Sequence, residues 1–551
     1  MQHHDTKTPD KKSSFLSGVF LLTLSAVLVK LTGLVTKIPM LHLLGAQGMG
    51  YYNAAYEVYA ALFVLSSAGL PVALSILISR AVSGRRRVFC IAMYLFAALG
   101  GIGGLSLWCG GDEIARWIGN AGAEASIRAL APAVLFVCLA SGIRGYYQGL
   151  GDMAPTAISQ VMEAAGKLIF GLLLAHFARR AGATVSHVAA AGAWGLSAGA
   201  LLALLYLIAR VSADFAAEGR MREDAIGVRA KAILSSQPIL RPMCAIAVPI
   251  TLSAAVTPLT RLLDMILILH RLRGNGCTEE VAGTLYGVYS TLAIPLYSLL
   301  PMMIGSLALP LVPGITAARG KGDLTAEREI VGTSLRLTCL LGVPASMGLS
   351  VFAAPILQLL FGGEDTAAAV LQAAPLMQVL GISVLGGCLI TILGAMLQAY
   401  GCHRVPLWAM LMGSAVKLIS AWILLGIPRV GMLGAPISTF LCHLTVLGIE
   451  SAVLAQRIPP RILPNGFLSR TLFASVCSVG GVWVIRRTLV YYLGDRRLMI
   501  LPLVLLCAMG YLCLSLRMGA LRREDVVSLS HGRELWILLC RLKLVPSGER
   551  L

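Results

Sequence analysis

Long apolar segments separated by short polar breaks dominate the chain. At 1.5 Å per residue, about fourteen of them are long enough to cross roughly 30 Å of hydrocarbon. They lie near residues 15–44, 51–79, 88–109, 127–149, 156–178, 188–210, 242–270, 282–313, 330–354, 367–398, 405–426, 432–455, 468–493 and 499–517. The pattern predicts an all-α polytopic membrane protein with about 14 transmembrane helices.

Composition agrees with lipid as the solvent. The 551 residues are 57% hydrophobic and 13% charged, with a mean hydropathy of +0.81, whereas soluble domains carry about 25% charged residues.

Lys11 and Lys12 before the apolar run 15–29 resemble a signal peptide. Hydrophobicity resumes past Lys30, so we expect an uncleaved first span. The cysteines are scattered without zinc-site spacing, which indicates reduced thiols.

The formal net charge is +19, and its distribution predicts the topology. With the N-terminus inside, cytoplasmic segments hold roughly 27 Lys and Arg and outer segments about 11. Because the span count is even, both termini are expected in the cytoplasm of a bacterial plasma membrane. No basic patch interleaved with aromatic residues occurs, so we expect no nucleic-acid partner.

The longest polar connection divides the first six spans from the next six. We expect a cytoplasmic tail (1–14), an N-lobe (15–210), a cytoplasmic connection (211–241), a C-lobe (242–455), two further helices (456–517) and a cytoplasmic tail (518–551). A weak repeat supports this division. Gln148-x-x-Gly151 and Lys167-Leu-Ile recur at one offset as Gln398-x-x-Gly401 and Lys417-Leu-Ile. Two halves of the same orientation form a parallel repeat, as in transporters with a central site between lobes.

The chain carries no phosphate-binding glycine loop, no HExxH and no nucleophile elbow, which argues against an enzyme. Ionisable residues inside spans are therefore the informative ones, because each costs at least about 2.5 kcal/mol at the bilayer centre unless it is paired or hydrated. The cations are Lys30, Lys37, Arg144, Lys167, Arg261, Arg336 and Lys417, and the acids are Glu57, Glu163, Asp264 and Glu450.

Several of these residues have structural explanations. Arg144, Arg336 and Glu450 lie near predicted cytoplasmic ends, where long side chains can reach the interface. Glu163 and Lys167 are spaced i, i+4 and can neutralise each other.

Five residues form the candidate substrate site. Lys30 and Lys37 lie two turns apart on one face of the first span, and Arg261 is central in the seventh. Cations facing a central cavity would suit a phosphate or pyrophosphate. Asp264 and Glu57 are assigned to charge balance or ion coupling. Alternatively, Arg261 and Asp264 satisfy each other and the lysines reach the outer interface.

Several stretches resemble the stage V sporulation protein B group of the multidrug/oligosaccharidyl-lipid/polysaccharide exporter superfamily. They include Leu-Gly-Ala-Gln-Gly-Met-Gly-Tyr-Tyr-Asn at 44–53, Arg-Gly-Tyr-Tyr-Gln-Gly-Leu-Gly-Asp-Met at 144–153 and Leu-Gln-Ala-Tyr-Gly at 397–401. The resemblance implies two six-helix lobes, extra C-terminal helices and alternating access. Lys30-x-x-Gly33 matches the basic-x-x-Gly of lipid II flippases, but their arginine in the second span has no counterpart here, and Glu57 lies there instead.

The resemblance therefore implies a flippase for an undecaprenyl-pyrophosphate-linked saccharide, such as lipid II or a spore-cortex precursor. The alternatives are a drug/cation antiporter of the same fold, a non-transporting sporulation scaffold, and a membrane glycosyltransferase, for which Asp112-Glu113 is the acidic candidate. We expect no cofactor or metal, a coupling ion that is Na⁺ or H⁺, membrane lipids and the lipid-linked saccharide as partners, and a monomer.

Overall fold

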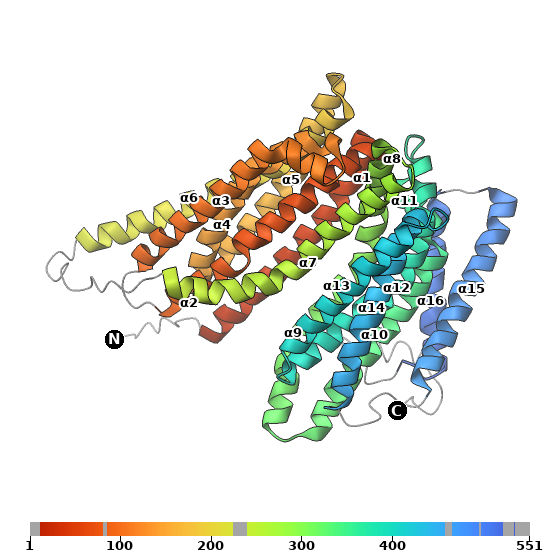
Figure 1. Ribbon diagram of the computed structural model, residues 1–551. Helices are drawn as coiled ribbons and strands as arrows, with labels where there is room; N and C mark the ends of the chain where they lie inside the picture. The colour runs from red at the N-terminus through yellow and green to blue at the C-terminus, as the bar shows by residue number, and fades with distance from the viewer. Residues whose placement is uncertain are drawn as a thin grey trace, which may run out of the picture. The chain divides into compact units, whose positions relative to one another are not determined.

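The computed structural model describes residues 11–80, 85–223, 240–457, 466–494, 497–521 and 534. Within these ranges the chain is built from helices and their connections (Figure 1). The α-helices are α1 (Lys11–Ser67), α2 (Gly69–Arg80), α3 (Arg85–Trp117), α4 (Glu124–Leu150), α5 (Ala154–Arg180), α6 (Val185–Glu223), α7 (Leu240–Gly274), α8 (Glu279–Val288), α9 (Ile294–Gly320), α10 (Leu324–Val351), α11 (Ala353–Phe361), α12 (Ala367–Ala399), α13 (Arg404–Leu425), α14 (Gly434–Ala455), α15 (Phe467–Leu493) and α16 (Ile500–Arg517). Short 3₁₀ turns are η1 (Ala121–Ala123), η3 (Gly431–Leu433) and η4 (Arg497–Met499), and a π-helical segment, η2 (Tyr289–Ala293), joins α8 to α9.

Among the described residues, 13 helical stretches are long and apolar enough to cross a membrane. The first, Val27–Arg80, has 54 residues, which corresponds to about 80 Å of helix and exceeds the length of one crossing. Its backbone breaks at Gly45, where φ is 69° and ψ is 177°. This is a conformation that glycine adopts at little cost. The stretch therefore holds the first two predicted spans, and the all-α prediction with about fourteen spans is confirmed.

Most span boundaries agree closely with the hydropathy pattern, and the largest difference is at the end of α6. Helix α6 continues to Glu223, well into the connection predicted at 211–241. Residues 211–223 are polar but contain neither proline nor a glycine pair, so nothing in them stops a helix beyond the apolar stretch. The rest of that connection, residues 224–239, and most of both predicted tails lie outside the described residues.

The chain divides into two compact units. Unit 1 contains residues 1–270 and 278–287, and unit 2 contains residues 271–277 and 288–551. In unit 1, α4 packs against α3 and α6, and α6 packs against α5. In unit 2, α12 packs against α10 and α14, and α14 packs against α13. The same order of neighbours therefore occurs in both units.

The predicted repeat has a local structural counterpart. Gly151 ends α4 with φ 84°, and Gly401 follows the end of α12 with φ 79°. The amide of Gly151 donates to the Gln148 carbonyl at 3.1 Å, and the amide of Gly401 donates to the Gln398 carbonyl at 3.0 Å. The recurring Gln-x-x-Gly motif thus forms the same helix-ending turn twice. Superposition of two complete six-helix lobes stays a prediction.

Glycines allow two helices of unit 1 to approach at backbone distance. A Cβ atom on Gly50 of α1 would overlap the carbonyl oxygen of Gly283 in α8. Beside this contact the Gln47 side-chain amide donates to Glu280 at 2.7 Å. Only hydrogen side chains permit this spacing, so the contact requires glycine at position 50.

A cluster of hydrophobic residues forms one core of unit 2. It joins α9, α10, α12 and Leu454 of α14. At its edge the Tyr400 hydroxyl donates to the Glu327 carboxylate, and the Arg319 guanidinium lies 4.6 Å from the centre of the tyrosine ring. The two C-terminal helices pack in the same unit, where the Tyr511 hydroxyl of α16 donates to the Leu340 carbonyl of α10 at 2.9 Å.

Candidate functional site

Charged side chains from three helices of unit 1 lie within electrostatic range of one another. Lys37 of α1 is partly buried and interacts electrostatically with Lys167 of α5, Glu57 of α1 and Arg261 of α7. Two of these partners carry the same charge as Lys37. Such repulsion between membrane-spanning helices is unfavourable without an anion or water.

A buried ion pair lies beside Lys167. The Arg144 guanidinium donates from Nη2 to Glu163 and from Nε to the Ser159 hydroxyl, each at 2.8 Å. Arg144 is 8% exposed. It is therefore held by α5 and does not reach toward the interface, as its position near a helix end had suggested. Glu163 was predicted to neutralise Lys167. Since Glu163 also bonds to Arg144, its negative charge is divided between the two cations.

Tyrosines of α1 complete the environment of Lys167. Its ammonium lies 4.8 Å from the centre of the Tyr56 ring, and Tyr52 is its hydrogen-bond partner. Tyr59, one turn after Tyr56, is buried between the same helices. A cation over an aromatic face is stabilised without losing its charge, so Lys167 can remain a cation inside the helix bundle.

We call Lys37, Glu57, Arg144, Glu163, Lys167 and Arg261 the unit 1 charge cluster. It contains four cations and two acids. The structure thus brings three of the predicted site residues together: Lys37, Arg261 and Glu57. The fourth, Asp264, lies on α7 one turn from Arg261. Asp264 is buried whereas Arg261 is exposed. The fifth, Lys30, is helical, but its side chain lies outside the described residues.

Helix α7, which carries Arg261, meets the start of α2 at a glycine. The Gly69 amide donates to the Thr251 hydroxyl at 3.1 Å, and a Cβ atom on Gly69 would overlap the Ala247 carbonyl oxygen. This is a local contact between α2 and α7 within unit 1.

Sequence spacing alone had not revealed the contributions of Arg144, Tyr52 and Tyr56. Their partners lie on other helices, so the spacing of residues within one helix does not predict these contacts. The positions of Arg144, Glu163 and Lys167 inside predicted spans were the available signal for this part of the cluster.

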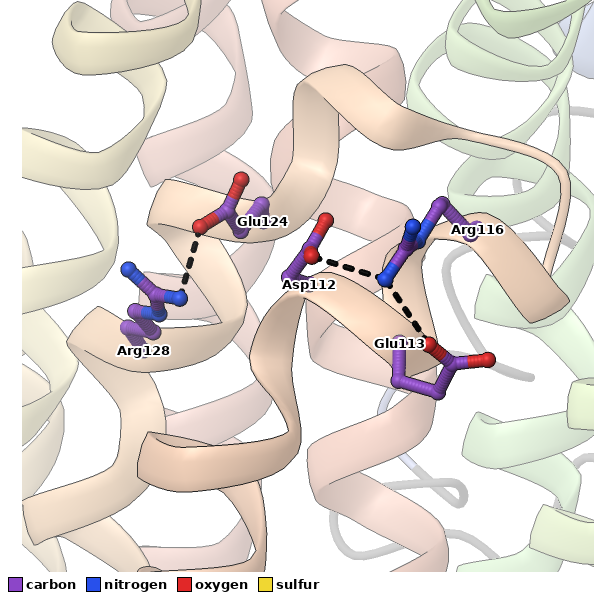
Figure 2. A network of polar contacts seen from close by, with 5 residues as sticks. All are labelled: Asp112, Glu113, Arg116, Glu124 and Arg128. Atoms are coloured by element: carbon purple, nitrogen blue, oxygen red, sulfur yellow. Dashed lines mark hydrogen bonds and ion pairs between the residues drawn. The ribbon is translucent and has the colours of Figure 1, made fainter.

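The acidic candidate for a glycosyltransferase is neutralised within its own helix. Figure 2 shows Asp112 and Glu113 converging on Arg116, at 2.9 and 2.8 Å. A second exposed pair, Arg128 with Glu124 at 2.8 Å, lies at the start of α4. No group of three or more potential metal-ligating side chains occurs in the part of the chain that the structure describes. The Asp112-Glu113 pair therefore provides no metal-binding cluster.

Many membrane-crossing helices, glycine-mediated helix contacts and a charge cluster inside the helix bundle define a multi-pass membrane protein of the transporter class. The chain belongs to the polysaccharide biosynthesis protein family, whose sequence profile matches residues 15–316, more than half of its length. The profile of the MatE family matches residues 249–423.

Curated relatives come from Bacillus subtilis (strain 168). The uncharacterized membrane protein YabM is 28% identical over 451 residues, with 81% of each chain covered. Stage V sporulation protein B is 23% identical over 455 residues, covering 81% of this chain and 85% of its own. The lipid II flippase MurJ is 23% identical over 459 residues, covering 79% and 81%.

Solved structures share the fold. The inward closed conformation of the lipid II flippase MurJ matches with a TM-score of 0.67 and 14% identity, over 90% of this chain and 98% of that one. An inward-facing multidrug resistance MATE family transporter of the MOP superfamily matches with a TM-score of 0.60 and 14% identity, over 78% and 98%. These findings confirm the resemblance to the exporter superfamily and identify the chain as a membrane transporter or flippase of that group.

Proposed function

We propose that this protein is a flippase that moves an undecaprenyl-pyrophosphate-linked saccharide, lipid II or a related cell-wall or spore-cortex precursor, across the bacterial plasma membrane by alternating access. The observation that carries the proposal is the excess of cations in the unit 1 charge cluster. Lys37 lies in the field of both Lys167 and Arg261, and an anionic headgroup would relieve that repulsion.

The chemistry of the cations suits a pyrophosphate. Arg261 can bind phosphate oxygens bidentately, whereas Lys37 acts as a compact point charge. Glu57 would offset part of the positive charge when the site is empty. Similarity to the lipid II flippase over most of both chains supports the substrate class.

A flipping assay with the purified chain tests this function. Fluorescent lipid II is reconstituted with the protein in vesicles, and a membrane-impermeant quencher reports the fraction in the outer leaflet over time. We expect protein-dependent movement of lipid II and no movement of a zwitterionic phospholipid with the same fluorophore. A chain that moves neither lipid II nor another undecaprenyl-pyrophosphate saccharide would contradict the proposal.

The second candidate is a drug/cation antiporter, favoured by the MatE match over residues 249–423. A cationic substrate would require acids to dominate its site, whereas cations outnumber acids two to one in the unit 1 charge cluster. Proton-driven efflux of a cationic dye from the same vesicles, without movement of lipid II, would establish this alternative.

A further inference from the structure

A histidine inside unit 2 has a defined pair of hydrogen-bond partners. His443 of α14 places Nδ1 3.0 Å from the backbone carbonyl of Ser383 in α12, and Nε2 2.9 Å from the Tyr297 hydroxyl of α9. A carbonyl only accepts, so Nδ1 carries a hydrogen. In the neutral ring Nε2 then accepts from Tyr297. A second proton would go to Nε2, and the Tyr297 hydroxyl would have to turn and accept.

A buried acid lies on the same face of α14. Glu450 follows His443 by seven residues, which is two helical turns. Its side chain is 1% exposed, and its Oε2 has no hydrogen-bond partner among the described residues. No ion pair found in those residues involves it. An ionised carboxylate is costly in such a place, so the environment fits a carboxyl group that carries a proton.

Glycines of α12 lie beside both groups. A Cβ atom on Gly387 would lie 3.5 Å from His443 Cε1, and one on Gly394 would lie 3.6 Å from Glu450 Oε1. Since the glycines also differ by seven residues, one face of α12 matches one face of α14. The two titratable groups thus form a row between packed helices.

The neighbours of this row determine its response to protons. Near His443, α13 contributes Lys417, which interacts with it electrostatically. Tyr297 lies at its other side, and the thiols of Cys388 and Cys442 and the phenol of Tyr289 are close to Tyr297. Near the far end of α14, the core that includes Leu454 also holds Tyr400. Tyr400 is bonded to Glu327 beneath Arg319. A proton on His443 would add a positive charge beside Lys417. Proton binding at His443 therefore depends on how close Lys417 lies to it in each conformation of unit 2.

We propose that His443 and Glu450 form a proton-binding pair that couples transport to the proton gradient. The proposal rests on the proposed flippase function, and it selects H⁺ rather than Na⁺ as the coupling ion. In the predicted topology Glu450 lies toward the cytoplasmic end of α14 and His443 nearer its middle. A proton that leaves Glu450 and binds His443 at Nε2 turns the carboxyl group into a carboxylate and the neutral ring into an imidazolium, so transfer between the two groups balances without another reactant.

The test uses the full chain in vesicles with a pH difference of one unit across the membrane. For one proton per cycle, the final distribution of fluorescent lipid II should shift about tenfold when the gradient is imposed. Glu450→Gln and His443→Asn should remove that shift while retaining exchange of lipid II without a gradient. Glu329→Gln, which changes an exposed acid of α10 in the same unit, should keep it. A response to a sodium gradient instead, or a full proton response in both variants, would overturn the proposal.

A transport-independent readout separates this proposal from the flippase function. The thermal midpoint of the detergent-solubilised chain is measured between pH 5 and 9. Its pH profile should change with His443→Asn and Glu450→Gln but not with Glu329→Gln, whether or not lipid II is moved. Identical profiles in all variants would overturn the proton-binding pair. Absence of exchange of lipid II and of any other undecaprenyl-pyrophosphate saccharide without a gradient, in contrast, would refute the flippase function alone.

Discussion

Arg144 and Glu163 form an ion pair of 2.8 Å between α4 and α5, 19 positions apart in the chain. Arg144 has 10% of its side chain exposed and Glu163 has 27%. The pair neutralises one cation of the unit 1 charge cluster and leaves Lys37, Lys167 and Arg261 with Glu57 as the other acid of that cluster. We therefore assign the pair a structural role and the other three cations to the proposed substrate site.

Removing one partner of this pair should destabilise the protein. Breaking a fully buried ion pair costs about 3–5 kcal/mol, and the partial exposure of Glu163 should bring Arg144→Ala toward the lower end of that range. The thermal midpoint in detergent should fall clearly. Arg128→Ala breaks the exposed pair with Glu124 (Figure 2) and should cost less than about 1 kcal/mol. Equal melting curves for the two variants would show that the buried pair is not structural.

A methyl group at position 50 should disrupt the contact between α1 and α8. Gly50→Ala places Cβ onto the Gly283 carbonyl oxygen, whereas Gly101→Ala, in α3, meets nothing within 4 Å. Both substitutions raise helix propensity by about 1 kcal/mol, so any difference between them reports the contact. We expect Gly50→Ala to lower the thermal midpoint or the yield of folded protein, and Gly101→Ala to do neither. Unchanged behaviour of Gly50→Ala would contradict the close approach.

Tyr400 should stabilise unit 2 through its hydroxyl. Burial and the hydrogen bond to Glu327 raise the pKa of Tyr400 above its ordinary value. The folded state therefore holds the phenolic proton more tightly than the unfolded chain. This contribution is complete below about pH 10 and is lost as pH rises above it. Tyr400→Phe leaves the buried Glu327 without that donor and should cost about 1–3 kcal/mol. A thermal midpoint equal to that of the parent protein at pH 7 would contradict this role.

The predicted topology can be tested by labelling. In a background without the native cysteines, a single cysteine in 211–241 should react only with reagents that enter the cytoplasm. A cysteine in the α5–α6 connection, residues 181–184, should react with an impermeant reagent from outside. Outside labelling of the probe in 211–241 would mean that the orientation inferred from the positive-inside rule is wrong.

The hydropathy pattern predicted the helices because each lipid-spanning helix must be apolar over a known length. All fourteen predicted spans begin or end within a few residues of an observed helix boundary, and α6 is longer only at its polar end. The break at Gly45 separates the first two spans where the pattern placed the boundary. A helix-ending glycine is a local property, so sequence sufficed there and at Gly151.

The candidate site was only partly predictable. Mid-span charges identified Lys37 and Arg261, since intramembrane charge is costly wherever it occurs. Contacts between helices could not be predicted from the sequence in the same way. Arg144 had been interpreted from its distance to a helix end, but its environment is set by Glu163 on the next helix. His443 was not considered because a neutral histidine in a span carries no formal charge, and only its bonds to Ser383 and Tyr297 reveal its position.

The cationic substrate site in unit 1 is tested most directly by measuring lipid II flipping in variants of the cations of the unit 1 charge cluster. Loss of one charge-assisted phosphate contact costs about 1.5–3 kcal/mol, so Arg261→Ala and Lys37→Ala should each reduce flipping by roughly tenfold or more, and Lys30→Ala should do the same if its side chain joins them. Arg261→Lys should restore part of the rate. Asp264→Asn should be mild if Asp264 only balances charge and severe if it couples an ion. Arg116→Ala, an exposed cation paired within α3, should flip at the parental rate. Full transport by correctly folded Arg261→Ala and Lys37→Ala variants would contradict a cationic substrate site in unit 1.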